Sequence, residues 1–387
     1  MRDEAMSKEA SQSEGDGQPT AGNTVDSTSR PIRQEAEKAT EAIDELAPGV
    51  LRSQLPVELP GLGHVNCYIL EDERGVAVID PGLPGSRSFA TLEGRLKLAG
   101  YKVSDIHTAI ITHSHFDHFG GAERIRTETG ADILTHESFR PVWEAKEARE
   151  NPDSVTAVSA EDDLDQAVAE GKAPWERGGK TPWGTERKPP LQSDIEAWEK
   201  IGMDERKWFR TPAPSVTVVD SEVIKLARRE WIAVHTPGHT GDHLCLWDPE
   251  YKIMVSGDHV LPTITPHIAG STEAHDPLAL FFQSLRRMSD FGDAQLVLPA
   301  HGHPFHGLVE RSDDIIEHHE ERLDTIRTAS EKLAEASVED YMKELFSPRV
   351  WGDMAGSETY AHLLHLEVLG EMRSSYRQDG VKLFAPS

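Results

Sequence analysis

Short apolar segments divide the chain into two β-rich blocks, which a long polar stretch separates. In the first block, runs rich in β-branched residues lie at 65–70, 75–80, 106–112 and 131–134. In the second block they lie at 215–219, 231–235, 243–247, 252–256 and 295–299. Turn-forming residues bound most of these runs, which therefore predict strands.

Apolar residues at helical spacing occupy the segments between and after the predicted strands. They predict helices at 88–99, from about 122, and at 278–289, 312–336 and 359–372, with a short closing strand at 381–384. Strands followed by helices in each block favour an α/β fold. In it, two sheets pack face to face with helices outside, as an αββα sandwich.

The composition predicts three parts. Residues 1–42 have hardly any large apolar side chains, cannot bury enough surface to offset the entropy of ordering, and should form a disordered tail. Residues 43–308 form the main domain, and residues 309–387 form a helical C-terminal module. Residues 139–214 are an insertion with five tryptophans. This insertion is either a cap packed by its own aromatic residues or a cap that also lines a substrate pocket.

The formal net charge of −27 is spread along the chain and repels phosphate backbones and anionic membranes, so we expect no nucleic-acid partner. No stretch approaches the roughly 20 apolar residues of a membrane span, and no secretory signal follows the N-terminal charges. The two cysteines, Cys67 and Cys245, lie in apolar segments. Two buried free thiols are favoured over one disulfide, and they fit a reducing compartment. We therefore expect a cytoplasmic protein that does not bind membranes.

Residues 113–118, His-Ser-His-Phe-Asp-His, hold four potential metal ligands in six positions. Three imidazole nitrogens and one carboxylate oxygen, this close together, suit divalent zinc, iron or manganese. The run follows the predicted strand 106–112 and precedes a predicted helix. It therefore lies at the carboxyl end of a strand, where α/β folds place their sites.

Three further candidates lie downstream, each beside a glycine and next to a predicted strand: His239, Asp258 and His301. Glycine allows the backbone to approach a crowded site without a Cβ clash. Together with residues 113–118 they resemble the motif set of the metallo-β-lactamase superfamily, from about residue 50 to 308. The resemblance is to its glyoxalase-II-like and lactamase-β-like branches.

The resemblance implies two metal ions held by seven side chains in two sets that share one carboxylate. The first set is His113, His115 and His239, the second is Asp117, His118 and His301, and Asp258 bridges the two. Zinc is the expected metal, with iron or manganese as alternatives. Two cations ~3.5–4 Å apart lower the pKa of a shared water towards ~7, and the resulting bridging hydroxide attacks a carbonyl.

Three residues are assigned further roles. Asp80 matches the family's acidic residue after the second strand, which orients the ligand loop by accepting an imidazole N–H. Asp117 can also accept a proton, although its main expected role is that of a ligand. His259 is a candidate for contact with a ligand or the substrate. Ser114, between two ligands, is expected to be a spacer and not a nucleophile.

These features predict a metal-dependent hydrolase of a thioester, carboxylic ester or lactone in a small substrate. The alternative is a persulfide dioxygenase with a single iron. A nucleic-acid phosphodiesterase fits poorly with the charge of −27, and a β-lactamase is disfavoured because Asp258 replaces the cysteine ligand of the antibiotic-destroying enzymes. Residues 309–387 resemble the winged-helix-like module of some glyoxalase-like members. That module should pack on the catalytic domain or on a second subunit, as in a homodimer.

Overall fold

A computed structural model describes residues 33–140, 180–187, 196, 211–270, 272 and 274–387. Residues 33–387 belong to one compact unit. Of the expected tail, residues 1–32 lie outside the described residues. Most of the insertion predicted at 139–214 also lies outside them.

Seven strands form the first sheet, in the order β1-β2-β3-β4-β5-β6-β7. Their bounds are β1 (Asp44–Ala47), β2 (Val50–Leu59), β3 (Leu62–Asp72), β4 (Gly75–Ile79), β5 (Ile106–Ile110), β6 (Asp132–His136) and β7 (Val216–Val218). Neighbours from β1 to β4 are antiparallel, and those from β4 to β7 are parallel. Between β4 and β6 lie the helical segments α1 (Ser86–Leu98), η2 (Val103–Asp105), α2 (Phe116–Phe119) and α3 (Ala122–Thr129).

Five strands form the second sheet, in the order β12-β11-β10-β9-β8. Their bounds are β8 (Val223–Leu226), β9 (Arg229–His235), β10 (Leu244–Asp248), β11 (Ile253–Gly257) and β12 (Leu296–Pro299). Only the β11–β12 pair is parallel among them. The helix α7 (Pro277–Arg287) and the short turn η5 (Met288–Phe291) precede β12.

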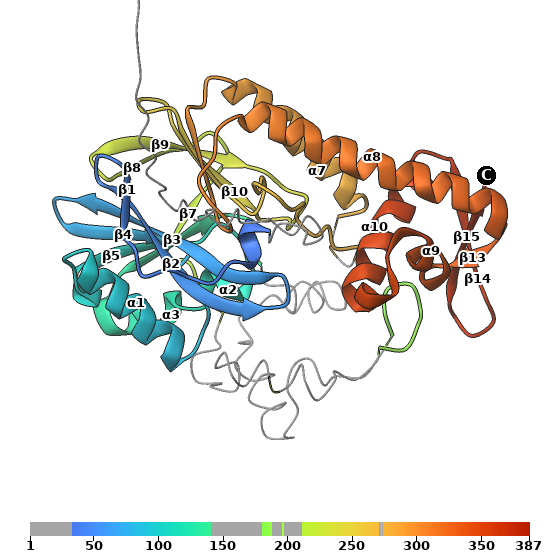
Figure 1. Ribbon diagram of the computed structural model, residues 1–387, viewed down its shortest axis with the longest axis horizontal. Coiled ribbons are helices and arrows are strands. Elements are labelled where there is room, and N and C mark those ends of the chain that lie inside the picture. Colours follow the sequence, from blue (N-terminus) through green and yellow to red (C-terminus); the bar gives the residue numbers. More distant parts are fainter. Residues whose placement is uncertain (1–32, 141–179, 188–195, 197–210, 271, 273) are drawn as a thin grey trace, which may run out of the picture. The chain divides into compact units, whose positions relative to one another are not determined.

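The two sheets face each other, with α1 and α3 outside the first and α7 outside the second (Figure 1). Successive side chains of β3 point to opposite faces of the first sheet, which explains why one layer packs on each face. Tyr68 and Leu70 enter the core between the sheets, whereas Cys67 and Ile69 pack towards α1 and α3. The αββα sandwich predicted from the sequence is therefore confirmed. Both cysteines, Cys67 and Cys245, are buried and unpaired.

Strand β1, strand β2 and the turn η1 of the N-terminal part were not predicted. Strand β2 was missed because it carries polar residues and Pro56, which lacks a ladder donor. Residues 33–42, assigned to the disordered tail, are instead part of the described fold and contain the short turn η1 (Gln34–Ala36). Composition could not predict this turn because Glu35, its buried residue, is held by hydrogen bonds and not by apolar contacts.

The C-terminal module is mainly helical and ends in a small sheet of order β13-β15-β14. Its elements are α8 (Leu308–Leu333), β13 (Ala336–Ser337), α9 (Val338–Leu345), η6 (Pro348–Val350), α10 (Asp353–Val368), β14 (Met372–Tyr376) and β15 (Lys382–Pro386). The turn η6, the strands β13 and β14 and the helix α9 were not predicted. Neither α8 nor any other described helix is long and apolar enough to cross a membrane.

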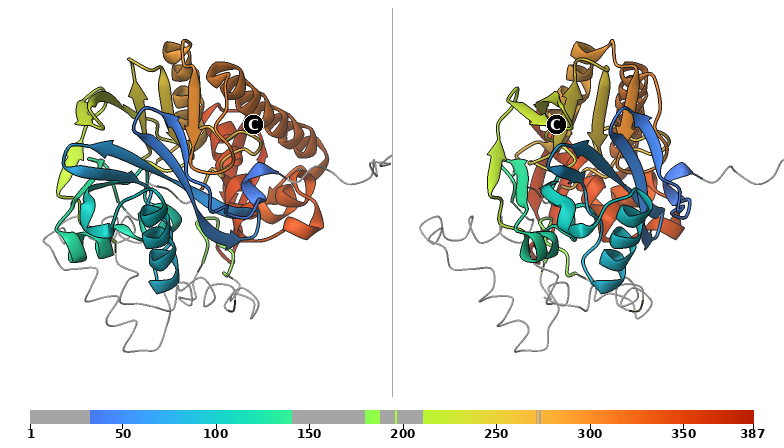
Figure 2. Two further views of the ribbon diagram at one scale, coloured as in Figure 1. Left: turned by 60° about the vertical axis from the view of Figure 1, so that its left-hand side comes forward. Right: turned by 90° about the vertical axis from the view of Figure 1, so that its left-hand side faces the viewer.

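Residues 180–187 of the insertion attach to this C-terminal module through Trp183. The Trp183 ring is buried against Tyr360 of α10, and its indole N–H donates to Glu339 Oε1 at 2.7 Å. Its backbone carbonyl accepts from the Lys382 N–H at 2.9 Å. The insertion therefore contributes a side chain to the core of the module (Figure 2, green segment).

His362 of α10 is a fully buried imidazole whose two nitrogens are both engaged. Its Nδ1–H donates to the Glu358 carbonyl at 2.7 Å, which leaves Nε2 to accept from His319 Nδ1 at 3.1 Å. Burial lowers the pKa of His362 to about 4. The folded chain therefore holds this ring neutral well below the ordinary histidine pKa of about 6.5.

This difference predicts that the free energy of unfolding falls as the pH is lowered from about 6.5 to about 4. In that range the unfolded chain protonates His362 and the folded chain does not, so stability rises with pH. The His362 contribution is about 3 kcal/mol. In urea titrations at pH 7 and pH 4.5, His362→Gln should lose less stability than the wild type on acidification. His306→Gln, at an exposed position, is the control. An unchanged pH dependence in His362→Gln would refute the assignment.

Candidate metal centre

The seven candidate ligands all follow the carboxyl ends of strands, and they come from both sheets. Residues 113–118 connect β5 of the first sheet to α2. His239 follows β9, Asp258 follows β11 and His301 follows β12 of the second sheet. Strand pairing aligns these ends, so the loops of both layers meet at one edge of the sandwich.

The structure brings the first predicted set together. His113, His115, His239 and Asp258 each offer one ligand atom, and these atoms all lie within 4.8 Å of one another. His115 Nδ1 lies 2.9 Å from His113 Nε2 and 3.1 Å from His239 Nε2. Asp258 Oδ2 lies 3.6 Å from His239 Nε2 and 4.0 Å from His113 Nε2.

The second predicted set also converges. The ligand atoms of Asp117, His118 and His301 lie within 4.8 Å of one another. Asp117 Oδ2 is 3.6 Å from His118 Nε2 and 3.5 Å from His301 Nε2. Asp258 connects the two sets, because its Oδ2 is 3.6 Å from His118 Nε2 and its Oδ1 is 3.4 Å from His301 Nε2.

Hydrogen bonds behind the imidazoles determine which ring nitrogen faces inward. Four histidines engage Nδ1 with an acceptor outside the cluster, which leaves Nε2 as a lone pair directed into it. The four contacts are His113 to Thr112 Oγ1 at 3.0 Å, His118 to Asp80 Oδ2 at 2.8 Å, His239 to the His267 carbonyl at 2.7 Å and His301 to the His64 carbonyl at 2.6 Å.

This donor set fits a cation. His118 Nε2, His301 Nε2 and Asp258 Oδ1 are buried and have no hydrogen-bonding partner among the described residues. Buried acceptors that face one another without a donor repel, and a divalent ion satisfies all of them at once. Imidazole and carboxylate ligands together suit zinc, iron or manganese.

The electrostatics of the cluster favour the same occupant. Burial, together with the neighbouring His118, lowers the pKa of His113 well below its usual value, so its imidazole is neutral. Burial alone would raise the pKa of Asp258, but His301 and His118 hold it well below its usual value. Burial also opposes a charge on His118, yet Asp117 and Asp258 raise its pKa well above the usual value, so without an ion its Nε2 holds a proton that a bound cation would displace. The pocket therefore attracts positive charge.

Asp80 stands behind the ligand loop, where the sequence predicted an orienting carboxylate. Its Oδ2 accepts from His118 Nδ1 at 2.8 Å and from the Thr112 hydroxyl at 2.7 Å, and its Oδ1 accepts from the Thr112 N–H at 2.9 Å. It has φ +53°, a left-handed conformation that Asp and Asn adopt more readily than most residues. Asp80 therefore orients His118 and closes the turn before it.

Two histidines near the ligands support the backbone. His243 Nε2 accepts from the Asp258 N–H at 3.0 Å, while its Nδ1–H donates to Thr236 Oγ1 at 2.7 Å. His267 contributes its carbonyl to His239. His259, considered for contact with a ligand or the substrate, is fully buried with its ring against Phe281. Its role stays a prediction.

Sequence reasoning missed three residues that shape the centre: His64, Thr112 and Asp242. His64 gives its carbonyl to His301, and Thr112 connects His113 to Asp80. Ser114 is more than a spacer, because its hydroxyl donates to buried Asp242 at 3.2 Å and so joins the loop of residues 113–118 to the loop after His239. No pattern in the sequence marks His64 or Asp242, since each acts through a contact with a distant segment.

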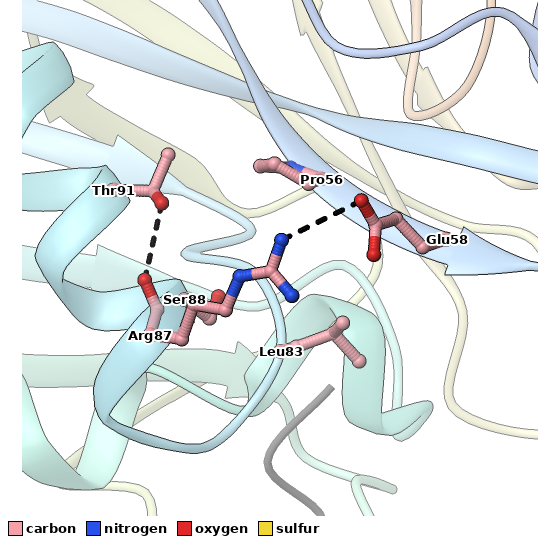
Figure 3. Close-up of a pocket in the computed structure, with 6 residues that line it drawn as sticks. All are labelled: Pro56, Glu58, Leu83, Arg87, Ser88 and Thr91. Carbon is pink, nitrogen blue, oxygen red and sulfur yellow. Dashed lines mark hydrogen bonds and ion pairs between the residues drawn. The ribbon is translucent and has the colours of Figure 1, made fainter. Parts of the chain in front are cut away.

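A small surface pocket lies elsewhere, between β2 and the start of α1 (Figure 3). Arg87 extends across it towards Glu58, with 3.6 Å between guanidinium and carboxylate. The pocket is lined by Pro56, Glu58, Leu83, Arg87, Ser88 and Thr91. None of the seven candidate ligands borders it, so it has no role in the chemistry of the cluster.

Comparison with known proteins agrees with this geometry. Residues 60–301 match the sequence profile of the Metallo-beta-lactamase superfamily. The chain is 24% identical to the probable metallo-hydrolase YflN of Bacillus subtilis (strain 168) over 265 residues, 64% of this chain and 84% of the relative. It is 26% identical to the acyl-coenzyme A thioesterase MBLAC2 of Gallus gallus over 249 residues, 62% of this chain and 74% of the relative.

The fold is shared with solved structures. A metallo-beta-lactamase family protein from Thermus thermophilus has a TM-score of 0.67 and 22% identity, covering 89% of this chain and 100% of that chain.

Asp80→Asn should weaken the binding of divalent metal ions by about 10- to 100-fold, as is typical for partners that orient a ligand. Asparagine tolerates the left-handed backbone, but its amide N–H₂ cannot accept the His118 proton. Zinc affinity measured by competition with a chromophoric chelator tests this expectation.

The matched control is Asp72→Asn. Asp72 Oδ2 lies 2.9 Å from Nε2 of another imidazole of the same sheet, His107, but this pair lies outside the cluster. The Asp72→Asn variant should bind zinc as tightly as the wild type does. Equal zinc affinities in Asp80→Asn and Asp72→Asn would contradict the orienting role of Asp80.

Proposed function

The chain belongs to the metallo-beta-lactamase superfamily and is a metal-dependent hydrolase, and from this premise we propose that it uses two divalent ions, most simply zinc, to hydrolyse a thioester, carboxylic ester or lactone. The observation that carries the proposal is the sharing of Asp258. One of its oxygens faces His239 and the other faces His301, so a single carboxylate serves both sets.

The side chains of the cluster have different roles in this proposal. When bound, such ions lower the pKa of water into the neutral range and polarise a carbonyl group. Five neutral imidazoles would hold the ions without adding charge, and Asp258 and Asp117 would supply the negative charge. Asp117 is buried beside both His118 and His301, and we assign it as a ligand that can also accept a proton. Asp80 keeps His118 turned inward.

The substrate class rests on two supports. A relative that shares 26% identity is named as an acyl-coenzyme A thioesterase, which hydrolyses a thioester. The net charge of −27 disfavours a nucleic-acid polymer and leaves a small acyl substrate as the best match. Asp258, where the antibiotic-destroying enzymes carry cysteine, disfavours β-lactam hydrolysis.

Metal analysis combined with a substrate panel tests this function. The purified chain should carry close to two equivalents of divalent metal and hydrolyse at least one class among thioesters, esters and lactones. Chelation should abolish the activity, and zinc should restore it. Metal-free protein with full activity would exclude the proposal. Oxygen uptake with glutathione persulfide and a single bound iron would instead identify a dioxygenase.

Asp258→Ala should reduce kcat/KM by at least about 100-fold, because removing a shared ligand should cost no less than removing a partner that only orients one. It should also bind fewer metal equivalents. His107→Ala is the control, since His107 lies at the opposite end of β5 from the cluster and should change neither quantity. Wild-type turnover in Asp258→Ala would rule out the two-ion arrangement.

A further inference from the structure

The N-terminal segment 34–37 (Figure 2, blue turn) lies outside the region that matches the family, and it contacts Thr263 and His64, which belong to two different segments that support the metal centre. We propose that it is a positioning element of this centre, which fixes the loop that carries His301 and the loop whose carbonyl orients His239. The inference rests on the proposed function and adds a segment that precedes the region matching the family.

The first contact is a buried carboxylate. Glu35 is fully buried, and its Oε1 accepts from the Thr263 N–H at 2.9 Å and the Ile264 N–H at 3.2 Å. Its Oε2 accepts from the Thr263 hydroxyl. Hydrogen bonds to a buried carboxylate are stronger than neutral ones, and a charge buried without them would be costly. Glu35 therefore holds residues 263 and 264 firmly in place.

The loop that Glu35 holds is part of the centre. Residues 263 and 264 lie between Asp258 and His267, whose carbonyl accepts from His239 Nδ1 at 2.7 Å. The same loop is held from the other side by Arg311 of α8, which donates to the Ile264 carbonyl at 2.8 Å. Because the loop is fixed at both sides, the His267 carbonyl has a defined position.

The second contact passes through His64. Its Nδ1–H donates to the Glu37 carbonyl at 2.8 Å, and its Nε2 accepts from the Gly302 N–H at 3.1 Å. The His64 carbonyl accepts from His301 Nδ1 at 2.6 Å. Glu37 thus orients the His64 ring, which holds Gly302. The carbonyl of His64 also orients the His301 imidazole.

The strand under the segment has the shape needed to receive it. A Cβ atom at Gly63 of β3 would lie 2.1 Å from the Glu37 carbonyl oxygen and 2.8 Å from that of Ala36. Both distances are shorter than any ordinary contact. Any side chain at residue 63 would therefore displace the segment, and this steric requirement is independent of the hydrogen bonds of Glu35.

Two full-length variants disturb different contacts of segment 34–37. Glu35→Ala removes the buried carboxylate, and Gly63→Ala displaces the backbone of residues 36 and 37. Each should weaken zinc binding by about 10-fold or more and alter the visible absorption spectrum of the cobalt-substituted protein. Glu35→Gln, which keeps an acceptor oxygen, should restore much of the affinity. The control is Glu41→Ala, since the Glu41 side chain is 88% exposed.

The outcomes separate this inference from the proposed function. Folded Glu35→Ala and Gly63→Ala proteins with wild-type zinc affinity and cobalt spectrum would overturn it. If circular dichroism shows Glu35→Ala to be unfolded, Gly63→Ala decides by the same two measurements. The proposed function fails separately, when the wild-type protein binds metal but hydrolyses no substrate in the panel. The comparison among variants is valid in that case too.

Discussion

Lone pairs that face one another inside the protein are the constraint on which the centre depends. Four imidazoles are turned inward because an acceptor behind each one takes its Nδ1 proton. These acceptors lie on the ends of β3 and β5, on the turn after β4 and on the loop after Asp258, so both sheets and their connections contribute. An arrangement of this kind is unfavourable without a cation, and the fold supplies the energy that keeps it assembled.

The part of this arrangement that is local in sequence could be predicted. Residues 113–118 place four donors on one turn, and His239, Asp258 and His301 each stand beside a glycine at a strand end. Apolar periodicity located most of the strands, because each of them buries at least one face. The sandwich and the grouping of the donors therefore followed from patterns that extend over ten residues or fewer, with the family resemblance giving their order.

The remaining part depends on contacts between distant segments. Strand β2 carries three consecutive polar residues, 52–54, and a proline, so its place in the sheet is visible only through its pairing with β3. Glu35 belongs to a segment with too few apolar residues to predict a fold, and it is held by backbone donors more than 200 positions away. His64 acts through its carbonyl oxygen, a group that every residue possesses. Residue type alone carries no information about such roles.

Trp183 has a consequence for engineering the chain. The segment 180–187 is inserted between strands of the first sheet, yet the ring of Trp183 is part of the core of the C-terminal module. Exchanging the module with that of a relative would leave this indole facing a surface that was not shaped for it. Exchanging the insertion alone would open a cavity beside Tyr360. A chimaera should therefore transfer both segments together as one cassette.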